Sequence, residues 1–174
     1  MKIFCAIAIV ILMPALLLRG QTNNLPIGPA TITSHTGFFS LNSHTATYQG
    51  NVQVDDPQMT LRCEWLMASM PPSGGRIDHI VCETNVVIDY FDQRGQTNHI
   101  TSDKAIYDYN VQGMVTNESI TFTGNPRIEN AQTITIGEPI IWNRADGNIV
   151  VMNGKTTFKQ GIGGLSGLTN SVPK

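Results

Sequence analysis

The sequence contains few charged residues, and this shortage restricts the partners that the protein can have. Asp, Glu, Lys and Arg together make up 14% of the 174 residues, against about 25% in an average soluble domain. The formal net charge is −2, and the basic residues form no cluster, which argues against a nucleic-acid partner. Small polar residues, with abundant Thr and Asn, take the place of charges, and Thr suits the pleated surface of a β-sheet.

The sequence also lacks the motifs of catalysis and of metal or cofactor binding. It contains no nucleophile elbow, no Gly-rich phosphate loop and no catalytic triad order. The four histidines are scattered, without Cys, Asp or Glu at ligand spacing on one strand face, which is typical of surface histidines; they are His35, His44, His79 and His99. We therefore expect no enzyme activity, no cofactor and no metal site.

Helical periodicity is missing after the first 20 residues, and alternation of apolar residues takes its place. Turn signals such as Asp56-Pro57 and Asp146-Gly147 recur at intervals of about 10 to 15 residues. Between them, apolar residues occupy every second position: Val52 and Val54; Val86, Ile88 and Tyr90; Ala105, Tyr107 and Tyr109. This pattern predicts an all-β protein, an antiparallel meander of about ten to twelve strands. Periodicity alone leaves a barrel, a sandwich and a stacked roll open.

One short phrase occurs three times, and it indicates a repeated architecture. The copies are Gly50-Asn51-Val52, Thr84-Asn85-Val86 and Gly124-Asn125-Pro126. They are separated by about 34 and about 40 residues, within the range of stacked repeats. A small residue and an Asn followed by alternating apolar residues predict a turn or bulge that enters a strand. Such a chain is a scaffold for a surface or a groove.

The N-terminus resembles an export signal. Lys2 precedes an apolar run over residues 3–18, and Arg19 follows it, as in the charged and apolar regions of a signal peptide. A membrane-spanning helix needs about 20 apolar residues, so a signal peptide over 1–20 is favoured, with an uncleaved membrane anchor as the alternative. Cleavage would remove two basic residues and bring the net charge to about −4.

The remaining chain divides into three parts by composition. Residues 21–37 contain Pro, Gly, Ser and Thr without a period, and we expect a linker or a loosely held first edge strand. Residues 38–158 form the predicted folded body. Residues 159–174 are rich in Gly, and we expect a flexible tail.

One hairpin allows a predicted register and a predicted cysteine contact. A turn centred between Pro72 and Ser73 pairs Arg62 with Glu83, Cys63 with Cys82 and Trp65 with Ile80. In an oxidising compartment, facing cysteines at this separation can form a cross-strand disulfide. Two buried reduced thiols that pack as small apolar side chains are the alternative.

Two segments after the repeats carry a family resemblance. These are Ser102-Asp103-Lys104-Ala105-Ile106-Tyr107-Asp108 and Ile120-Thr121-Phe122-Thr123-Gly124-Asn125-Pro126. With the small-Asn-Val strand starts, they make residues from about 46 to 158 resemble the OstA-like (LptA) family of periplasmic lipopolysaccharide-transport proteins. Trp65, Trp142, the hairpin tip over 67–75 and the Gly-rich tail are not part of that pattern.

The resemblance implies a V-shaped, slotted antiparallel β-jellyroll whose apolar interior holds lipid A acyl chains. The residues inferred to line this lipid-binding groove are Val52, Val54, Leu61, Trp65, Val86, Ile88, Ala105, Tyr107 and Ile128. The implied partners are lipopolysaccharide or a related amphiphile, and other OstA-like proteins or a second copy, paired through the 38–48 and 150–158 edges.

The predicted function is therefore a periplasmic lipopolysaccharide carrier that bridges towards the outer membrane. Two alternatives remain open from the residues. One is an inner-membrane-anchored component of the same pathway, which would keep residues 3–18 as its tether. The other is a ligand-free structural β-roll that self-assembles, because apolar alternation also fits a core filled by its own side chains.

Overall fold

The computed structural model describes residues 28–92 and 95–159, and these residues form an all-β protein, as predicted. The expected signal peptide over 1–20 and nearly all of the expected tail lie outside the described residues. In the described part, no helix is long and apolar enough to cross a membrane. The strands are β1 (Thr31–Thr33), β2 (Thr36–Ser40), β3 (Thr45–Asp56), β4 (Met59–Ser69), β5 (His79–Phe91), β6 (Thr97–Gln112), β7 (Val115–Thr123), β8 (Arg127–Glu129), β9 (Thr133–Ile136), β10 (Ile140–Asn143), β11 (Asn148–Val151) and β12 (Lys155–Phe158).

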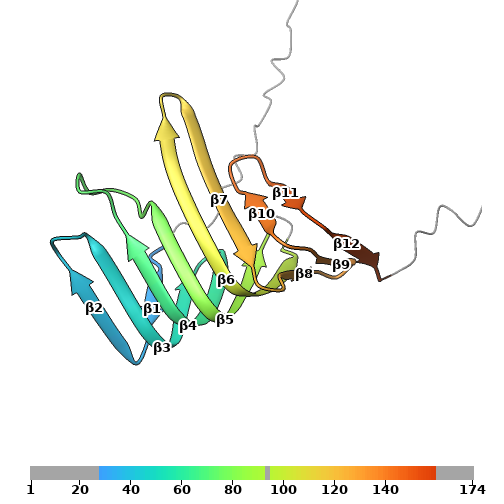
Figure 1. Cartoon of the computed structure of the whole chain (residues 1–174), viewed down its shortest axis with the longest axis horizontal. Coiled ribbons are helices and arrows are strands. Elements are labelled where there is room, and N and C mark those ends of the chain that lie inside the picture. The colour runs from blue at the N-terminus through green and yellow to red at the C-terminus, as the bar shows by residue number, and fades with distance from the viewer. Residues whose placement is uncertain (1–27, 93–94, 160–174) are drawn as a thin grey trace, which may run out of the picture.

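The long strands β3 to β6 belong to two half-sheets at once, because each of them crosses the bend of the molecule (Figure 1). The upper half-sheet has the order β2-β3-β4-β5-β6-β7-β10-β11. The lower half-sheet has the order β1-β3-β4-β5-β6-β8-β9-β12. The described pairs are antiparallel, so the predicted antiparallel jellyroll is confirmed.

The Gly-Asn repeats create the bend. Two consecutive residues have positive φ in each copy: Gly50 and Asn51 (80° and 46°), Thr84 and Asn85 (67° and 54°), Gly124 and Asn125 (75° and 56°). The first two copies lie inside β3 and β5, where the register with the neighbouring strand shifts. An extra residue in one strand of a pair bends that strand and increases its twist. The first two copies are therefore bulges within strands rather than at strand entrances, whereas the third copy lies between β7 and β8, at the entrance of β8, as predicted.

Carboxylates on neighbouring segments hold two of these bulges. The N–H of Asn51 donates to Glu64 Oε2 at 3.4 Å. The N–H groups of Gly124 and Asn125 donate to the two oxygens of Glu138 at 3.2 and 3.1 Å. Successive N–H groups that point to one side form a concave anion site, so the acidic side chain satisfies donors that the bulge removes from the ladder.

The core lies on the inner face of the V, between the two half-sheets. It consists of Val52, Val54, Leu61, Cys63, Leu66, Ala68, Cys82, Val86, Ile88, Ile100, Ala105, Ile120, Phe122, Ile128 and Ile140. One cross-strand row shows the pattern: Leu66 faces Cys82, Cys82 faces Ala105, and Ala105 faces Phe122. These residues are buried because every second side chain of a strand points to the same face.

The register predicted for the β4–β5 hairpin is wrong. Trp65 faces Glu83, not Ile80, and Arg62 faces Val87 beyond a register shift. Ser69 pairs with His79, and residues 70–78 connect the two strands. The hairpin is therefore centred on Gly74, not between Pro72 and Ser73. Glu83 forms its ion pair with Lys104 on β6 at 2.8 Å, rather than with Arg62.

Candidate functional site

Three hollows follow one another along the inner face in the order of the strands. The first hollow, about 240 Å³, lies beside β1 to β4 and includes Ile32, Phe39 and Tyr48. The middle hollow, about 180 Å³, lies over β4 to β7. The third hollow, about 350 Å³, lies between β5, β6 and β8 on one side and β10 and β11 on the other. Their lining is mostly apolar, and we refer to the three hollows together as the trough.

The first hollow opens at the N-terminal edge of the molecule. Phe39 on β2 meets Tyr48 on β3 edge to face, with ring centroids 5.7 Å apart. Phe39 nevertheless remains 62% exposed, because β2 has no strand on its outer side. An aromatic side chain with this much accessible surface gains free energy when another apolar group covers it.

Buried aliphatic residues form the floor of the middle hollow, and charged residues stand at its rim. Leu61, Ile88, Ala105 and Ile120 line the floor and are each at most 6% exposed. The rim carries two arginines, Arg76 from the β4–β5 connection and Arg144 from the segment after β10. An apolar floor with a charged rim is the surface that an amphiphile matches.

A single carboxylate joins the two arginines. Arg76 donates to Glu118 Oε1 at 2.8 Å, and Arg144 lies 3.3 Å from the same oxygen. The Glu118 side chain is 13% exposed, whereas Arg144 is 22% and Arg76 is 50% exposed. Burial raises the pKa of the Tyr107 hydroxyl beside this cluster, and the negative charge of Glu118 raises it further. The three charged groups together carry one net positive charge.

Aromatic rings hold the two guanidinium groups in place. Arg76 lies over the Tyr109 ring at 4.3 Å from its centroid. Arg144 lies 5.5 Å from the centroid of Trp142 and 5.9 Å from that of Tyr90. Contacts of this kind attract a guanidinium group electrostatically without occupying its N–H donors.

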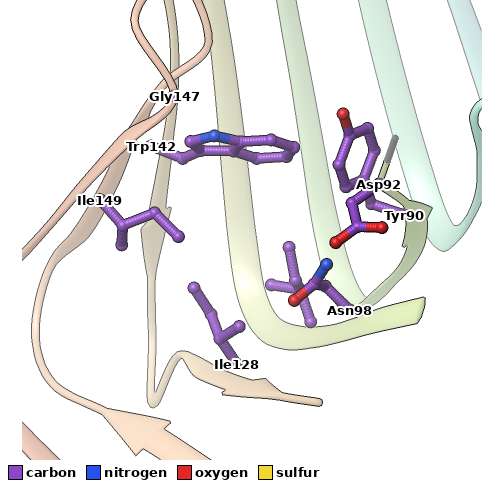
Figure 2. Close-up of a pocket in the computed structure, with 8 residues that line it drawn as sticks. Tyr90, Asp92, Asn98, Ile128, Trp142, Gly147 and Ile149 are labelled. Atoms are coloured by element: carbon purple, nitrogen blue, oxygen red, sulfur yellow. The ribbon is translucent and has the colours of Figure 1, made fainter. Parts of the chain in front are cut away.

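Aromatic and aliphatic side chains enclose the third hollow from opposite sides (Figure 2). Trp142 on β10 and Tyr90 on β5 lie at one end of the hollow, and Ile128 lies at the other end. Ile149 of β11 lines the side, while Asn98 adds a polar group. Trp142 and Ile149 come from the C-terminal strands, so this hollow exists only because β10 and β11 fold back over β5 and β6.

Eight of the nine predicted groove residues lie in the core or pack against it. Seven are buried: Val52, Val54, Leu61, Val86, Ile88, Ala105 and Ile128. Tyr107 is partly buried and packs against them. Leu61, Ile88, Ala105 and Tyr107 line the middle hollow, and Ile128 lines the third. Whether these residues contact lipid remains a prediction.

The inward orientation predicted for Trp65 is wrong. Trp65 stands in a cross-strand row with Gln49 and Glu83, and neither of these residues is buried. Leu61 and Cys63 are buried before the register shift between Arg62 and Trp65, and Leu66 is buried after it. The irregularity moves the inward positions from odd to even numbers, so Trp65 lies on the outer face.

Cys63 and Cys82 are free thiols in the structure, although they are near neighbours. On β4, Cys63 lies within the register shift opposite the bulge of β5, and the β4 partner of Cys82 is Leu66. The predicted direct pairing of Cys63 with Cys82 therefore does not occur. Cys82 donates a hydrogen bond to Cys63, which lowers the pKa of Cys63 and raises that of Cys82; burial raises the pKa of Cys82 further. The disulfide between Cys63 and Cys82 remains a prediction.

Sequence reasoning did not find the charged rim. Arg76, Glu118 and Arg144 are far apart in the sequence, and each belongs to a segment with no motif. Trp142 stands out in the sequence only as a departure from the family pattern. Among the residues that the structure describes, no group of His, Cys, Asp or Glu could hold a metal ion.

The fold and the trough define a class, the slotted β-jellyroll with an apolar interior, and the comparisons place the chain within it. Residues 31–148, more than half of the chain, match the family model described as the LptA/(LptD N-terminal domain) LPS transport protein. The chain belongs to this family of lipopolysaccharide-transport proteins, whose described role is transport rather than catalysis.

A solved structure with a similar fold is LptH from Pseudomonas aeruginosa, described as the LptA-homologous periplasmic component of the conserved lipopolysaccharide transport device. The TM-score is 0.60 at 10% sequence identity, over 71% of this chain and 81% of that one. The match to LptH supports the fold alone. No curated protein matched the sequence.

Proposed function

We propose that this protein is a periplasmic lipopolysaccharide carrier that shields acyl chains in the trough on its inner face and passes them towards the outer membrane. The observation that carries the proposal is the line of three apolar hollows between the two half-sheets. Family membership supplies the class of cargo, because the family model describes lipopolysaccharide transport. LptH, which has a similar fold, is described as periplasmic.

Apolar burial alone is strong enough to hold such a cargo. Removing apolar surface from water contributes about 25 cal/mol per Å², or about 0.8 kcal/mol for each buried methylene group. The middle hollow is lined by residues such as Leu61 and Ile88, which cannot satisfy polar groups but can pack against hydrocarbon. Reversible binding of several acyl chains therefore requires no covalent step.

The two tryptophans permit a direct test, because they lie on opposite faces. The variant Trp65→Phe keeps only Trp142, which lines the third hollow, and Trp142→Phe keeps only Trp65 on the outer face. Bromine atoms on an acyl chain quench tryptophan fluorescence at short range. We expect a brominated-acyl amphiphile to quench Trp142 and leave Trp65 unchanged, and we expect lipopolysaccharide to restore the fluorescence of Trp142.

The two variants are controls for each other, since they carry the same substitution at different faces. Equal quenching of Trp65 and Trp142 would show adsorption to the surface and would contradict the trough. Quenching of Trp142 that lipopolysaccharide does not reverse would show that the trough binds a different amphiphile.

We also propose that neighbouring molecules of this family join edge to edge, so that their troughs align. The N-terminal edge consists of β1 and β2, and the C-terminal edge consists of β11 and β12. The exposed apolar residues Phe38 (68%) and Phe158 (52%) lie on these edges. Unprotected edge strands of this kind accept a strand from another chain.

The expected edge over 38–48 requires one correction. Residues 45–48 belong to β3, which pairs with β2 and with β4, and Leu41 lies in the turn after β2. The free ladder at this end is therefore that of β1 and β2. Leu41 lies outside β2, so the substitution Leu41→Pro would not remove a hydrogen-bond donor from the free ladder.

The choice between a released protein and an anchored protein depends on residues 1–20, outside the described residues. We propose cleavage of this segment and release into the periplasm. N-terminal sequencing of the protein from separated periplasmic and membrane fractions tests this directly. An intact Met1 in the membrane fraction would favour the anchored component of the same pathway.

A further inference from the structure

We infer that Arg76 and Arg144 form a headgroup clamp that selects amphiphiles with an anionic head, so that the middle hollow holds an acyl chain while the clamp binds the phosphate or carboxylate to which it is attached. This inference deepens the proposed function and rests on it. Its new content is the pair of residues and the selection by charge.

The first observation is the placement of the two arginines. Both line the middle hollow, although one comes from the β4–β5 connection and the other from the segment after β10. Arg144 also reaches across the slot, where its Nη2 donates to Gln58 Oε1 at 3.5 Å. The clamp therefore stands where the two half-sheets approach each other above the apolar floor.

The second observation is the excess of positive charge. Both arginines contact the same oxygen of Glu118, and two guanidinium groups have far more N–H donors than one carboxylate can accept. Arg76 is half-exposed and Arg144 is 22% exposed, so both keep some surface in contact with solvent. Guanidinium groups bind carboxylates and phosphates through paired N–H donors.

The third observation is that aromatic rings lie against both guanidinium groups. Arg76 lies over the Tyr109 ring, and Trp142 and Tyr90 flank Arg144. A preorganised charged pair loses less conformational entropy on binding than two free side chains would. The apolar floor and the cationic rim are adjacent, which matches a molecule whose anionic head follows directly on its acyl chain.

The test compares two amphiphiles with the same dodecyl chain: dodecyl phosphate, which is anionic, and dodecyl maltoside, which is uncharged. Their affinities are measured by displacement of an apolar fluorescent dye from the full-length protein. The double variant Arg76→Gln/Arg144→Gln should lose about tenfold in affinity for dodecyl phosphate, as expected for charge-assisted hydrogen bonds. Its affinity for dodecyl maltoside should stay unchanged. The matched control is Arg62→Gln, on the exposed outer side of β4.

A variant with the opposite effect keeps the test independent of folding losses. Glu118→Gln removes the carboxylate that the arginines share, and it should raise the affinity for dodecyl phosphate severalfold. In the unaltered protein, added NaCl should weaken binding of dodecyl phosphate and leave dodecyl maltoside unaffected. Inorganic phosphate at the same concentrations should not compete, because it lacks the chain.

The outcomes separate this inference from the proposed function. If the unaltered protein binds neither amphiphile, the carrier function and the clamp both fail. If both amphiphiles bind and the arginine variants weaken them equally, or leave both unchanged, the carrier function stands and the clamp is wrong. Competition by inorganic phosphate alone would assign the arginines to a free anion and overturn the lipid headgroup.

Discussion

The indole of Trp142 on β10 meets the phenol ring of Tyr90 on β5 edge to face, with ring centroids 4.7 Å apart and planes inclined by 69°. Tyr90 belongs to the lower half-sheet and Trp142 to the upper one. The contact therefore spans the slot between the middle and third hollows, next to Arg144. It sets the width of the trough at this point.

Removing this contact should widen the slot and weaken the fold. We expect Trp142→Ala to lower the free energy of unfolding by about 1–3 kcal/mol, below the value for a fully buried tryptophan because Trp142 is only partly buried. The amount of apolar dye that the protein binds should rise, because loss of the indole would join the third hollow to the middle one. Urea unfolding and dye titration measure the two effects.

Trp65→Ala is the control for the slot, since Trp65 lies on the outer face. It should leave dye-binding capacity unchanged. A change in capacity of the same size in both variants would show that the slot is not what limits binding.

A charge on the free edge should prevent edge-to-edge association. Phe39 on β2 is 62% exposed and lines the first hollow. Phe39→Lys places an inward-pointing charge on the edge strand, a device that blocks strand addition. We expect concentration-dependent oligomers to be lost in sedimentation velocity, while the circular dichroism spectrum stays that of a β-protein.

Met114→Lys supplies the matched control for this edge. Met114 lies in the β6–β7 turn, fully exposed and away from both sheet edges. The same change of charge there should leave the oligomers intact. If Met114→Lys also abolishes association, general repulsion or a contact through the hairpin is responsible.

The middle repeat contains a strained backbone conformation at Thr84 that a substitution can relieve. Thr84 has a φ of 67°, a conformation that costs a β-branched residue about 1–2 kcal/mol. The equivalent position in the other repeats is a glycine, Gly50 or Gly124. We expect Thr84→Gly to raise the free energy of unfolding by about 1 kcal/mol, after the greater entropy of glycine in the unfolded chain is subtracted.

The opposite substitution in the third repeat should destabilise the protein. A Cβ on Gly124 would lie 2.5 Å from the Cβ of Asp103, and its φ of 75° adds strain. Gly124→Ala should therefore lower the urea midpoint, whereas Thr84→Gly should raise it. Shifts in the same direction would contradict the view that the repeats share one strained conformation.

Acid should weaken the attachment of the last strand. Hydrogen bonds from Lys159 and then from Arg127 lower the pKa of Glu129 from its ordinary value of 4.5 to about 2. Because the folded-state pKa is depressed, the ion pairs stabilise the fold above pH 4.5 and lose their contribution as the pH falls towards 2. Lys159 follows directly after β12, so this contribution attaches β12 to β8.

The variant Glu129→Gln measures that contribution. The difference in urea midpoint between this variant and the unaltered protein should be largest near neutral pH and should disappear near pH 2. High salt should reduce the difference, because the Glu129 side chain is 31% exposed. A difference independent of pH would show that the glutamine disturbs packing instead.

The all-β class, the Gly-Asn bulges and most of the inward-facing residues followed from the sequence alone. Alternation identifies one face of a strand, and Val52, Val86 and Ile88 are buried as that rule requires. Two consecutive positive φ angles suit glycine and asparagine, so the bend positions can also be read from local residues.

Only the tertiary structure decided which side of the sheet a residue faces after a bulge, and which distant residues meet. The register shift in β4 moves the inward positions from odd to even numbers, which is why Trp65 points outward although the period predicted otherwise. The cluster of Arg76, Glu118 and Arg144 depends on three segments brought together by the curl of the sheet. No local pattern encodes that meeting, because it arises from the sum of twists and bulges along all the strands between them.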